Sequence, residues 1–365
     1  MGHQRLLRRA RGTAALVTAS PSTLSGAARQ ETLRRPAALR LGWLLAGVAL
    51  LVVLCAASLV FGARDVSITD LVGAFSGNDT TFGEAAVIKR IPRTVLAVLV
   101  GAALAIAGAS MQGVTRNPLA DPGILGVSSG AALAVVIGIA GFGLSEPYGM
   151  VGLAIAGAAL AAVGVYTVGS LGRGGATPLK LTLAGAAVSA ALSSLVSAIL
   201  LPRVDVLTLY QFWQIGGVGG ADWGRIGAVT PILVVGVVLC FLSARGMNML
   251  ALGDDLASGL GERVLRTRLL AAIGAIVLCG AATAIAGPIG FVGLVVPHVC
   301  RLLVGTDFRW LLPFSAVLGA ALLVAADVLG RVVARPEEIQ VGIITAIIGA
   351  PFFIWIVRRQ RVREL

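Results

Sequence analysis

Residues 90–131 read RIPRTVLAVLVGAALAIAGASMQGVTRNPLADPGILGVSSGA, and this stretch decides the fold. It opens with a basic cluster, continues through about twenty apolar and small residues, and breaks at NPLADPG, residues 117–123, before a second apolar run. Two prolines and a glycine between membrane-length segments force the backbone out of the helix. Inside a bilayer, irregular backbone is tolerated only where protein buries it or where it lines a wet cavity. The stretch therefore indicates a transport pathway rather than a passive anchor.

The rest of the chain is just as apolar. Of its 365 residues, 57% are hydrophobic and 13% are charged, whereas soluble domains carry about 25% charged residues. The 48 glycines suit closely packed membrane helices. The composition predicts an all-α polytopic membrane protein with a single domain and little mass outside the lipid.

The positive charges are concentrated near the chain ends. Residues 1–40 carry eight Arg, and residues 358–365 carry four. Arginine beside apolar spans follows the positive-inside rule, so the net charge of +12 does not point to nucleic acid. Counting Lys and Arg places 21 inside and 8 outside if both termini are cytoplasmic. We interpret residues 1–40 as a disordered cytoplasmic tail, with a transit sequence as the alternative, and residues 358–365 as a C-terminal tail.

Ten apolar segments are predicted to cross the membrane, since a helix needs about 20 apolar residues to do so. Together they make a ten-helix domain over residues 41–357. The segments lie near residues 41–61, 93–113, 124–141, 149–170, 181–201, 225–243, 267–287, 289–304, 311–330 and 340–357.

The two halves of this domain echo each other. GAALAIAG at residues 101–108 matches GAATAIAG at residues 280–287 in seven of eight positions, and each copy precedes a segment broken by proline and glycine. The predicted topology makes the two copies run in opposite directions. We therefore expect two inverted five-helix repeats, near residues 41–201 and 225–357.

The chain lacks an energy source of its own. Asp327 is the one acid well inside a predicted span, and an i,i+4 ion pair with Arg331 that anchors the helix end is the favoured explanation over an ion-coupling site. Lys89 and Lys180 do not follow glycine, so there is no P-loop for ATP. A partner ATPase is therefore expected to drive transport, and an ion-coupled secondary carrier is the remote alternative.

No metal site and no cofactor are predicted for this chain. The four cysteines lie far apart, without the spacing of metal ligands, and suit small buried positions. His298 follows Pro297, and we assign it a structural hydrogen-bonding role.

The polar segment ARGMNMLALGDDLASGLGERVLRTR, residues 244–268, is predicted to meet the partner ATPase. It can form two short helices, the first ended by Gly253 and the second capped by Asp254 or Asp255 and ended by Gly261. An ordinary amphipathic loop at the interface is the alternative. The apolar side chains expected to form a knob for the partner are Met247, Met249, Leu250, Leu252 and Leu256.

These features resemble the permease subunits of the iron-siderophore, haem and cobalamin class of ABC importers, the FecCD type. The resemblance covers nearly everything from residue 41 onward. Besides residues 90–131, it is carried by LTLAGAAVSA at 181–190, FWQIGGVGGADW at 212–223, MNMLALGDDLASGLG at 247–261, GPIGFVGLVVPHVCRLLVGTDFRWLLPFSAVLGA at 287–320 and AADVLGRVVARPEEIQVGIITAIIGAPFFIWIV at 325–357.

The resemblance implies a ten-span permease in the bacterial cytoplasmic membrane that pairs with a second copy or a related permease. Two cytoplasmic ATPase subunits, which bind ATP and magnesium, would drive it, and an extracytoplasmic binding protein would deliver the ligand. The RNPLADP form favours an iron(III)-siderophore as cargo, with cobalamin or haem as the alternative.

The resemblance also assigns roles to residues. It makes Arg90, Arg93 and Arg331 docking sites for the binding protein. Without the resemblance, lipid-phosphate anchoring or local pairs with Glu84, Glu337 or Glu338 would be the favoured explanation. The family has proline where Gln340 stands, which affects the outer entrance near the last span. Coupling to the ATPase falls to Leu252, Gly253, Asp254, Ala257 and Gly261.

The transport pathway is implied to run along the fifth and tenth spans. Serines at helical spacing in the fifth span offer a polar face, although helix–helix hydrogen bonding would explain them too. The inner gate corresponds to the loop with Gly174, Gly175, Thr177 and Pro178. The polar face comprises Ser189, Ser193, Ser194 and Ser197, and the broken-helix segment contains Asn117, Pro118, Asp121 and Pro122.

Overall fold

Helices make up all the regular structure in the described part of the chain. The structure, a computed structural model, describes residues 36–144, 146–171 and 178–359. In chain order its helices are α1 (Ala37–Val60), α2 (Ile68–Phe75), α3 (Phe82–Thr115), the 3₁₀ helix η3 (Pro122–Leu125), α4 (Val127–Phe142), α5 (Pro147–Ser170), α6 (Pro178–Leu200), α7 (Val204–Ile215), α8 (Trp223–Leu250), α9 (Asp254–Gly259), α10 (Val264–Ala286), α11 (Val292–Val304), α12 (Phe308–Val333) and α13 (Val341–Arg359).

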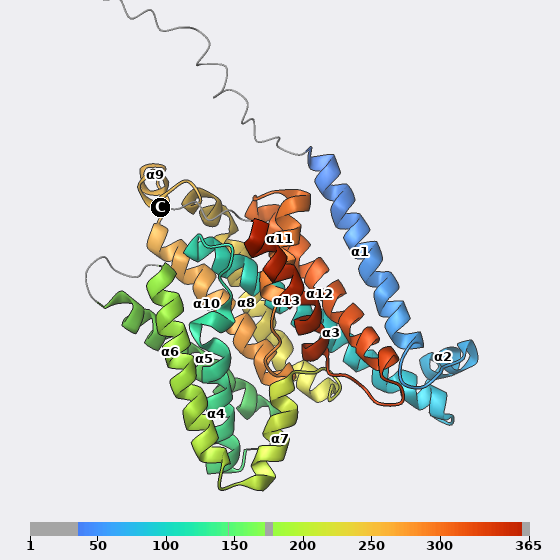
Figure 1. Cartoon of the computed structure of the whole chain (residues 1–365). Helices are drawn as coiled ribbons and strands as arrows, with labels where there is room; N and C mark the ends of the chain where they lie inside the picture. The colour runs from blue at the N-terminus through green and yellow to red at the C-terminus, as the bar shows by residue number, and fades with distance from the viewer. Residues whose placement is uncertain (1–35, 145, 172–177, 360–365) are drawn as a thin grey trace, which may run out of the picture. The chain divides into compact units, whose positions relative to one another are not determined.

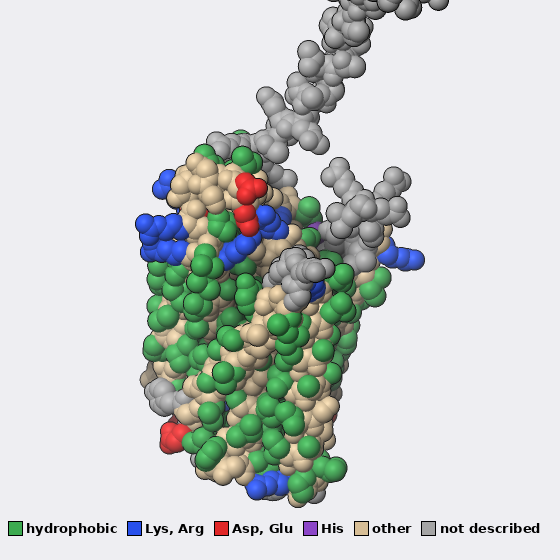
Figure 2. All heavy atoms as spheres, turned by 90° about the vertical axis from the view of Figure 1, so that its left-hand side faces the viewer, with side chains coloured by type: hydrophobic (Ala, Val, Ile, Leu, Met, Phe, Trp, Pro, Cys, Tyr) green, Lys and Arg blue, Asp and Glu red, His purple; other side chains and the backbone are tan. Residues whose placement is uncertain are grey.

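Seven of the described helices, α1, α3, α5, α6, α8, α10 and α12, are long and apolar enough to cross a membrane. Three shorter apolar helices, α4, α11 and α13, coincide with the remaining predicted segments. Figure 2 shows hydrophobic side chains over the middle of one face and charged ones gathered toward its two ends. The predicted all-α membrane architecture is therefore confirmed.

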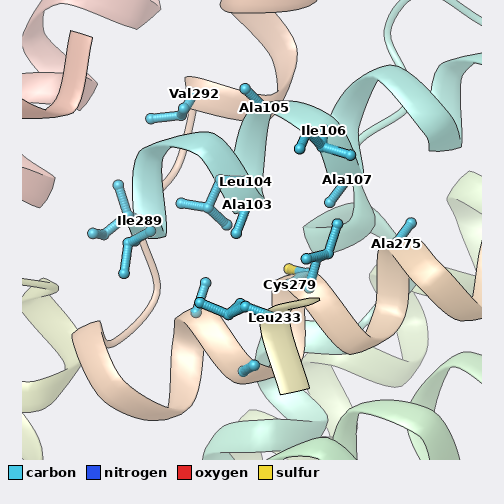
Figure 3. Close-up of a cluster of buried hydrophobic side chains, with 14 of the residues drawn as sticks. Ala103, Leu104, Ala105, Ile106, Ala107, Leu233, Ala275, Cys279, Ile289 and Val292 are labelled. Carbon is cyan, nitrogen blue, oxygen red and sulfur yellow. The ribbon is translucent and has the colours of Figure 1, made fainter. Parts of the chain in front are cut away.

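α3 is the central helix of the bundle. It packs against α12, α10, α11 and α8, while α1 lies at the edge with most of its surface exposed (Figure 1). Small residues permit the close approach, because a side chain on Gly101 would collide with the backbone of Gly319 in α12. Figure 3 shows the buried cluster that results, in which Leu104 and Ala107 of α3 lie close to Cys279 of α10.

Side-chain caps explain where several helices begin. Ser67 and Thr81 form capping boxes with Asp70 and Glu84 at the starts of α2 and α3. Asp222 and Asp307 accept backbone N–H groups at the starts of α8 and α12. The box at Thr81 starts α3 eleven residues before the predicted span. We call the end of the bundle that carries α9 the inner end, and the opposite end, with α2 and α7, the outer end (Figure 1).

Candidate functional site

The NPLADPG run interrupts the helical backbone between α3 and α4. α3 ends at Thr115, and its C-cap residue Arg116 is in the left-handed conformation at φ 52°. Asn117 and Asp121 then hold the turn with their side chains, accepting the amide N–H groups of Leu119 at 3.0 Å and Gly123 at 2.7 Å. The short helix η3 starts at Pro122, and α4 follows it. The prolines and the two side-chain turns thus replace helical hydrogen bonding with a compact bend.

A second break lies in the other half of the chain, and the two breaks touch. Gly287 and Phe291 both have positive φ, and α11 begins directly after them. Gln112, near the end of α3, donates its side-chain amide to the carbonyl of Gly293 at 3.1 Å. A side chain on Gly293 would also meet the carboxylate of Asp121. Gly293 is thus the point where both irregular segments are held together.

The predicted coupling segment contains one short helix, α9, with a glycine on each side. Gly253 (φ 115°) precedes α9 and Gly261 (φ 83°) follows it, in conformations that favour glycine. Ala257 is buried and anchors the helix. The apolar side chains that point outward are Leu252, Leu256 and Leu260, at 58%, 63% and 62% exposure.

Three details of the sequence prediction for this segment are wrong. The first of the two expected helices is the end of α8, which continues to Leu250. Met247 and Leu250 are buried there and cannot join an exposed knob. Gly253, rather than Asp254 or Asp255, occupies the N-cap position of α9, and no side chain caps the helix. Apolar periodicity alone does not show which face of an extended helix the core will cover.

Asp254 connects α9 to two other elements. Its carboxylate pairs with Arg116, at the break after α3, and with Arg268 of α10 at 2.9 Å. All three side chains are more than one-third exposed, so each pair by itself adds little stability. The arrangement joins α9 to the broken-helix segment. Neither arginine was predicted, because residues 138 and 14 positions away in the chain carry no local signal.

At the outer end, Arg90, Arg93 and Arg331 form one cluster with Asp327 and Glu338, which we call the outer arginine cluster. The i,i+4 pair predicted for Asp327 and Arg331 is confirmed at 3.0 Å. Arg93 pairs with both acids, at 2.8 Å to Asp327 and 2.7 Å to Glu338. Asp327 therefore lies between the guanidinium groups of Arg93 and Arg331. These two ion pairs account for a carboxylate at this position without a role in coupling ion flow to transport.

Two arginines of this cluster hold the outer end of α1. Arg90 donates to the carbonyls of Leu59 and Val60, each at 2.9 Å. Arg331 donates to the carbonyl and hydroxyl of Ser58, at 3.0 and 2.6 Å. These contacts satisfy carbonyls that a helix C-terminus leaves unpaired. Both arginines are buried, so their predicted docking role stays a prediction, and in this structure both guanidinium groups face the protein.

The predicted gate and pathway residues are only partly described. Gly174, Gly175 and Thr177 lie outside the described residues, and Pro178 is the first residue of α6. On α6, Ser193 and Ser197 are exposed in the single chain and Ser189 is half-buried. The hydroxyl of Ser197 donates to the carbonyl of Ser193 in its own helix at 3.1 Å. The serine face is thus presented outward, and its role in the pathway stays a prediction.

Gln340 lies in a junction of three helix ends at the outer end. The amide of Gly217 donates to the carbonyl of Ala286 at 2.8 Å, and the amide of Gly342 donates to Gly216 at 3.0 Å. The side chain of Gln340 lies against Gly217. α7, α10 and α13 are thereby joined, beside a cavity of about 620 Å³ that Tyr210, Trp213, Arg225 and Gln340 help to line.

A helical membrane protein with two touching helix breaks and a short glycine-flanked helix at one end has the architecture of a transporter subunit. The chain matches the FecCD transport family over residues 50–359. It belongs to this family, which comprises the permeases of ABC importers for siderophores, haem and cobalamin.

Relatives and a solved structure agree with this assignment. The chain is 45% identical to the probable siderophore transport system permease YfiZ of Bacillus subtilis (strain 168), over 85% of this chain and 93% of that one. It is equally similar, with the same coverage, to the ferric enterobactin transport system permease FepD of Escherichia coli (strain K12). A solved inward-facing ABC transporter of the metal-chelate type superposes with a TM-score of 0.75 at 30% identity, covering 88% of this chain and 99% of that one.

The family assignment defines the kind of protein. The chain is the non-catalytic permease subunit of an ABC importer and an integral multi-pass membrane protein. It is part of an ABC import system, which implies ATPase and binding-protein partners.

Proposed function

We propose that this permease carries an iron(III)-siderophore complex inward, paired with a second permease and driven by two cytoplasmic ATPase subunits that hold ATP and magnesium. An extracytoplasmic binding protein delivers the complex. The siderophore permeases among its relatives support this cargo. Cobalamin and haem are the alternative cargoes, because permeases for them belong to the same family.

Ten helices cross the membrane in this proposal, in two inverted halves near residues 41–201 and 225–357. α11 has 13 residues, which is about 20 Å of helix and too short for a hydrocarbon core of about 30 Å. The irregular residues before it complete the crossing, and the break before α4 does the same in the first half. Contact between the two breaks at Gly293 supports this arrangement of the halves. Both termini, with residues 1–40 and 358–365, lie in the cytoplasm in this proposal.

α9 is the coupling element in this proposal. The observation that supports the function most directly is the exposure of this helix together with its ion pair to the break after α3. Its exposed leucines insert into a cleft of the ATPase, while Gly253 and Gly261 let it tilt. Asp254 passes the movement to Arg116 and thus to the break between α3 and α4. A helix that transmits movement needs an exposed surface for the ATPase, freedom to tilt and a connection to the membrane helices. The leucines, the flanking glycines and the ion pair with Arg116 give α9 these three properties.

At the outer end, Arg93 is the best candidate for docking the binding protein, because it is less enclosed than Arg90 and Arg331 and already binds carboxylates. The pathway follows the serine face of α6 and also α13, and the loop with Gly174, Gly175, Thr177 and Pro178 forms the inner gate. The break around Asn117, Pro118, Asp121 and Pro122 transmits movement to this gate.

The experiment is uptake of radiolabelled ferric siderophores and cobalamin by cells with and without the chain. Loss of siderophore uptake, with cobalamin unaffected, is the expected result, and the reverse would reassign the cargo. Replacing residues 254–261 by a flexible linker should abolish uptake but leave folding intact. Asp254→Asn should reduce uptake several-fold while Asp255→Asn, at the exposed neighbouring carboxylate, does not. Uptake by the purified chain on an ion gradient, without any ATPase, would favour a secondary carrier instead.

A further inference from the structure

α2 carries its apolar side chains on its exposed face. Ile68, Val72 and Phe75 are 81%, 63% and 67% exposed, and their spacing puts them on one side of the helix. A helix on the surface of a globular protein normally turns its apolar side toward the core. Within the described residues, α2 does the reverse, so its outward face fits an apolar surrounding rather than water.

The opposite face of α2 carries Asp70, Gly73 and the buried Ala74, and a hydrogen bond attaches it to the start of α3. The hydroxyl of Thr81 donates to Asp70 at 2.9 Å, and Gly73 lies directly against the carboxylate of Glu84. Glu84 in turn accepts the amide N–H groups of Thr80 and Thr81, each at 2.9 Å. The hydrogen bond to Asp70 and the burial of Ala74 together orient α2, and the larger apolar side chains are left on the outer face.

The surroundings of α2 identify what covers its apolar face. Figure 1 shows α2 at the edge of the bundle, beside the outer end of α1. α1, which is long and apolar enough to cross a membrane, turns large apolar side chains outward, including Val52 and Val53, as a lipid-facing helix does. Phe82, the first residue of α3, is 84% exposed, and the guanidinium of Arg64 lies 5.7 Å from the centre of its ring. Apolar side chains next to an arginine are typical of the lipid headgroup region.

We propose that α2 lies flat in the outer membrane–water interface and inserts Ile68, Val72, Phe75 and Phe82 into the lipid. The face of this eight-residue helix continues the lipid-facing surface of α1, which favours lipid over a second copy or a soluble partner. α2 is thereby a membrane-surface anchor for the first turn of α3. Because Arg90 and Arg93 lie two to three turns further along α3, the anchor sets the height of the outer arginine cluster above the bilayer.

The test uses an environment-sensitive fluorophore on cysteines introduced by Val72→Cys, Ile68→Cys and, as the control, Asn78→Cys in the exposed loop after α2. Cys55 is first replaced by alanine because it is half-buried, and the parent with its three buried cysteines gives the background. The full chain is reconstituted in vesicles of phosphatidylcholine and phosphatidylglycerol. Quenching by a spin-labelled lipid and by iodide in the water is then compared.

Labels at positions 68 and 72 should be quenched by the spin-labelled lipid several-fold more than the label at position 78, and iodide should show the reverse order. Equal access of iodide to positions 72 and 78 would overturn the proposal. So would protection of position 72 that develops only when the binding protein is added, or only at protein densities at which the chain pairs, because a protein surface would then cover α2.

Discussion

α9 and the outer arginine cluster are the two regions predicted to meet soluble partners, and they present their side chains in opposite ways. α9 exposes Leu256 and Leu260 and buries only Ala257. The cluster buries Arg90 and Arg331, which hold α1 in place. Residues that support the fold and residues predicted to bind a partner are thus separated at the inner end, whereas at the outer end the same arginines are assigned both roles.

The physical reason lies in the chemistry of the two surfaces. An apolar knob needs only a short helix with hinges, and its exposure outside the membrane costs the fold little. A guanidinium near the membrane must find partners, and the carbonyls at the end of α1 and Asp327 supply them. A change in the cluster is therefore expected to act on stability, and a change in α9 on coupling.

The largest effect is expected from Arg331→Ala. The variant leaves carbonyls of α1 unpaired and removes one cation from Asp327, and breaking a buried ion pair costs about 3–5 kcal/mol. Unfolding of the purified chain in detergent measures this loss. Arg335→Ala is the matched control, since its pair with Asp65 lies on the surface and should contribute under about 1 kcal/mol. Equal losses for the two variants would contradict the structural role of Arg331.

The next largest effect is expected from Leu256→Asp combined with Leu260→Asp. A tenfold weaker binding of the ATPase, about 1.4 kcal/mol, should accompany an unchanged free energy of unfolding. Binding of the purified ATPase to the reconstituted permease measures it. Ser258→Asp adds one negative charge on the other side of α9, as each leucine substitution does on the exposed side, and should leave the affinity as it is. A drop in stability with intact affinity would show that α9 is a structural element.

A smaller effect is expected from Glu338→Gln, which frees one side of Arg93. The pair is partly exposed, so its loss should change stability by less than about 1 kcal/mol. If Arg93 docks the binding protein, the affinity for that protein should rise two- to threefold and depend more steeply on salt. Glu337→Gln at the neighbouring residue serves as the control. An unchanged affinity would mean that Glu338 does not compete for the docking site.

The smallest effect concerns the attachment of α2. Hydrogen bonds from the hydroxyl and the amide of Ser67 and from the hydroxyl of Thr81 lower the pKa of Asp70. A carboxyl with a lowered folded-state pKa stabilises the attachment above its ordinary pKa of about 3.9, and this contribution is lost as pH falls through the folded value. Fluorescence of a label at position 72 should stay constant from pH 7 to about 5 and change only below about 4. The step should be absent in Asp70→Asn.

Much of the fold could be read from apolar length and from helix breakers. The ten predicted segments each coincide with a helix, and the two breaks fall where proline and glycine require them. α2 and α7 were missed because both are shorter than a membrane crossing. Yet Ser67 and Asp70 have the spacing of a capping box, which could have revealed α2.

The candidate site was less predictable. The glycines around α9 were recognised from turn chemistry, and both adopt positive φ. The partners of Asp254, and the burial of Met247, depend on which helices meet in space. Gln340 was noticed as a departure from the family pattern, but its position against Gly217 follows only from the junction of α7, α10 and α13.

Local chemistry therefore established that the chain is a bundle of membrane helices with two breaks and a hinged segment. Hydrophobic length, proline and glycine act on their own neighbourhood, and their effects do not depend on the rest of the molecule. Tertiary packing decided that both breaks meet at Gly293, that Arg331 holds α1 in place, and that α2 turns its apolar side outward. Contacts between residues far apart in the chain depend on the joint arrangement of all the helices, which no single segment encodes.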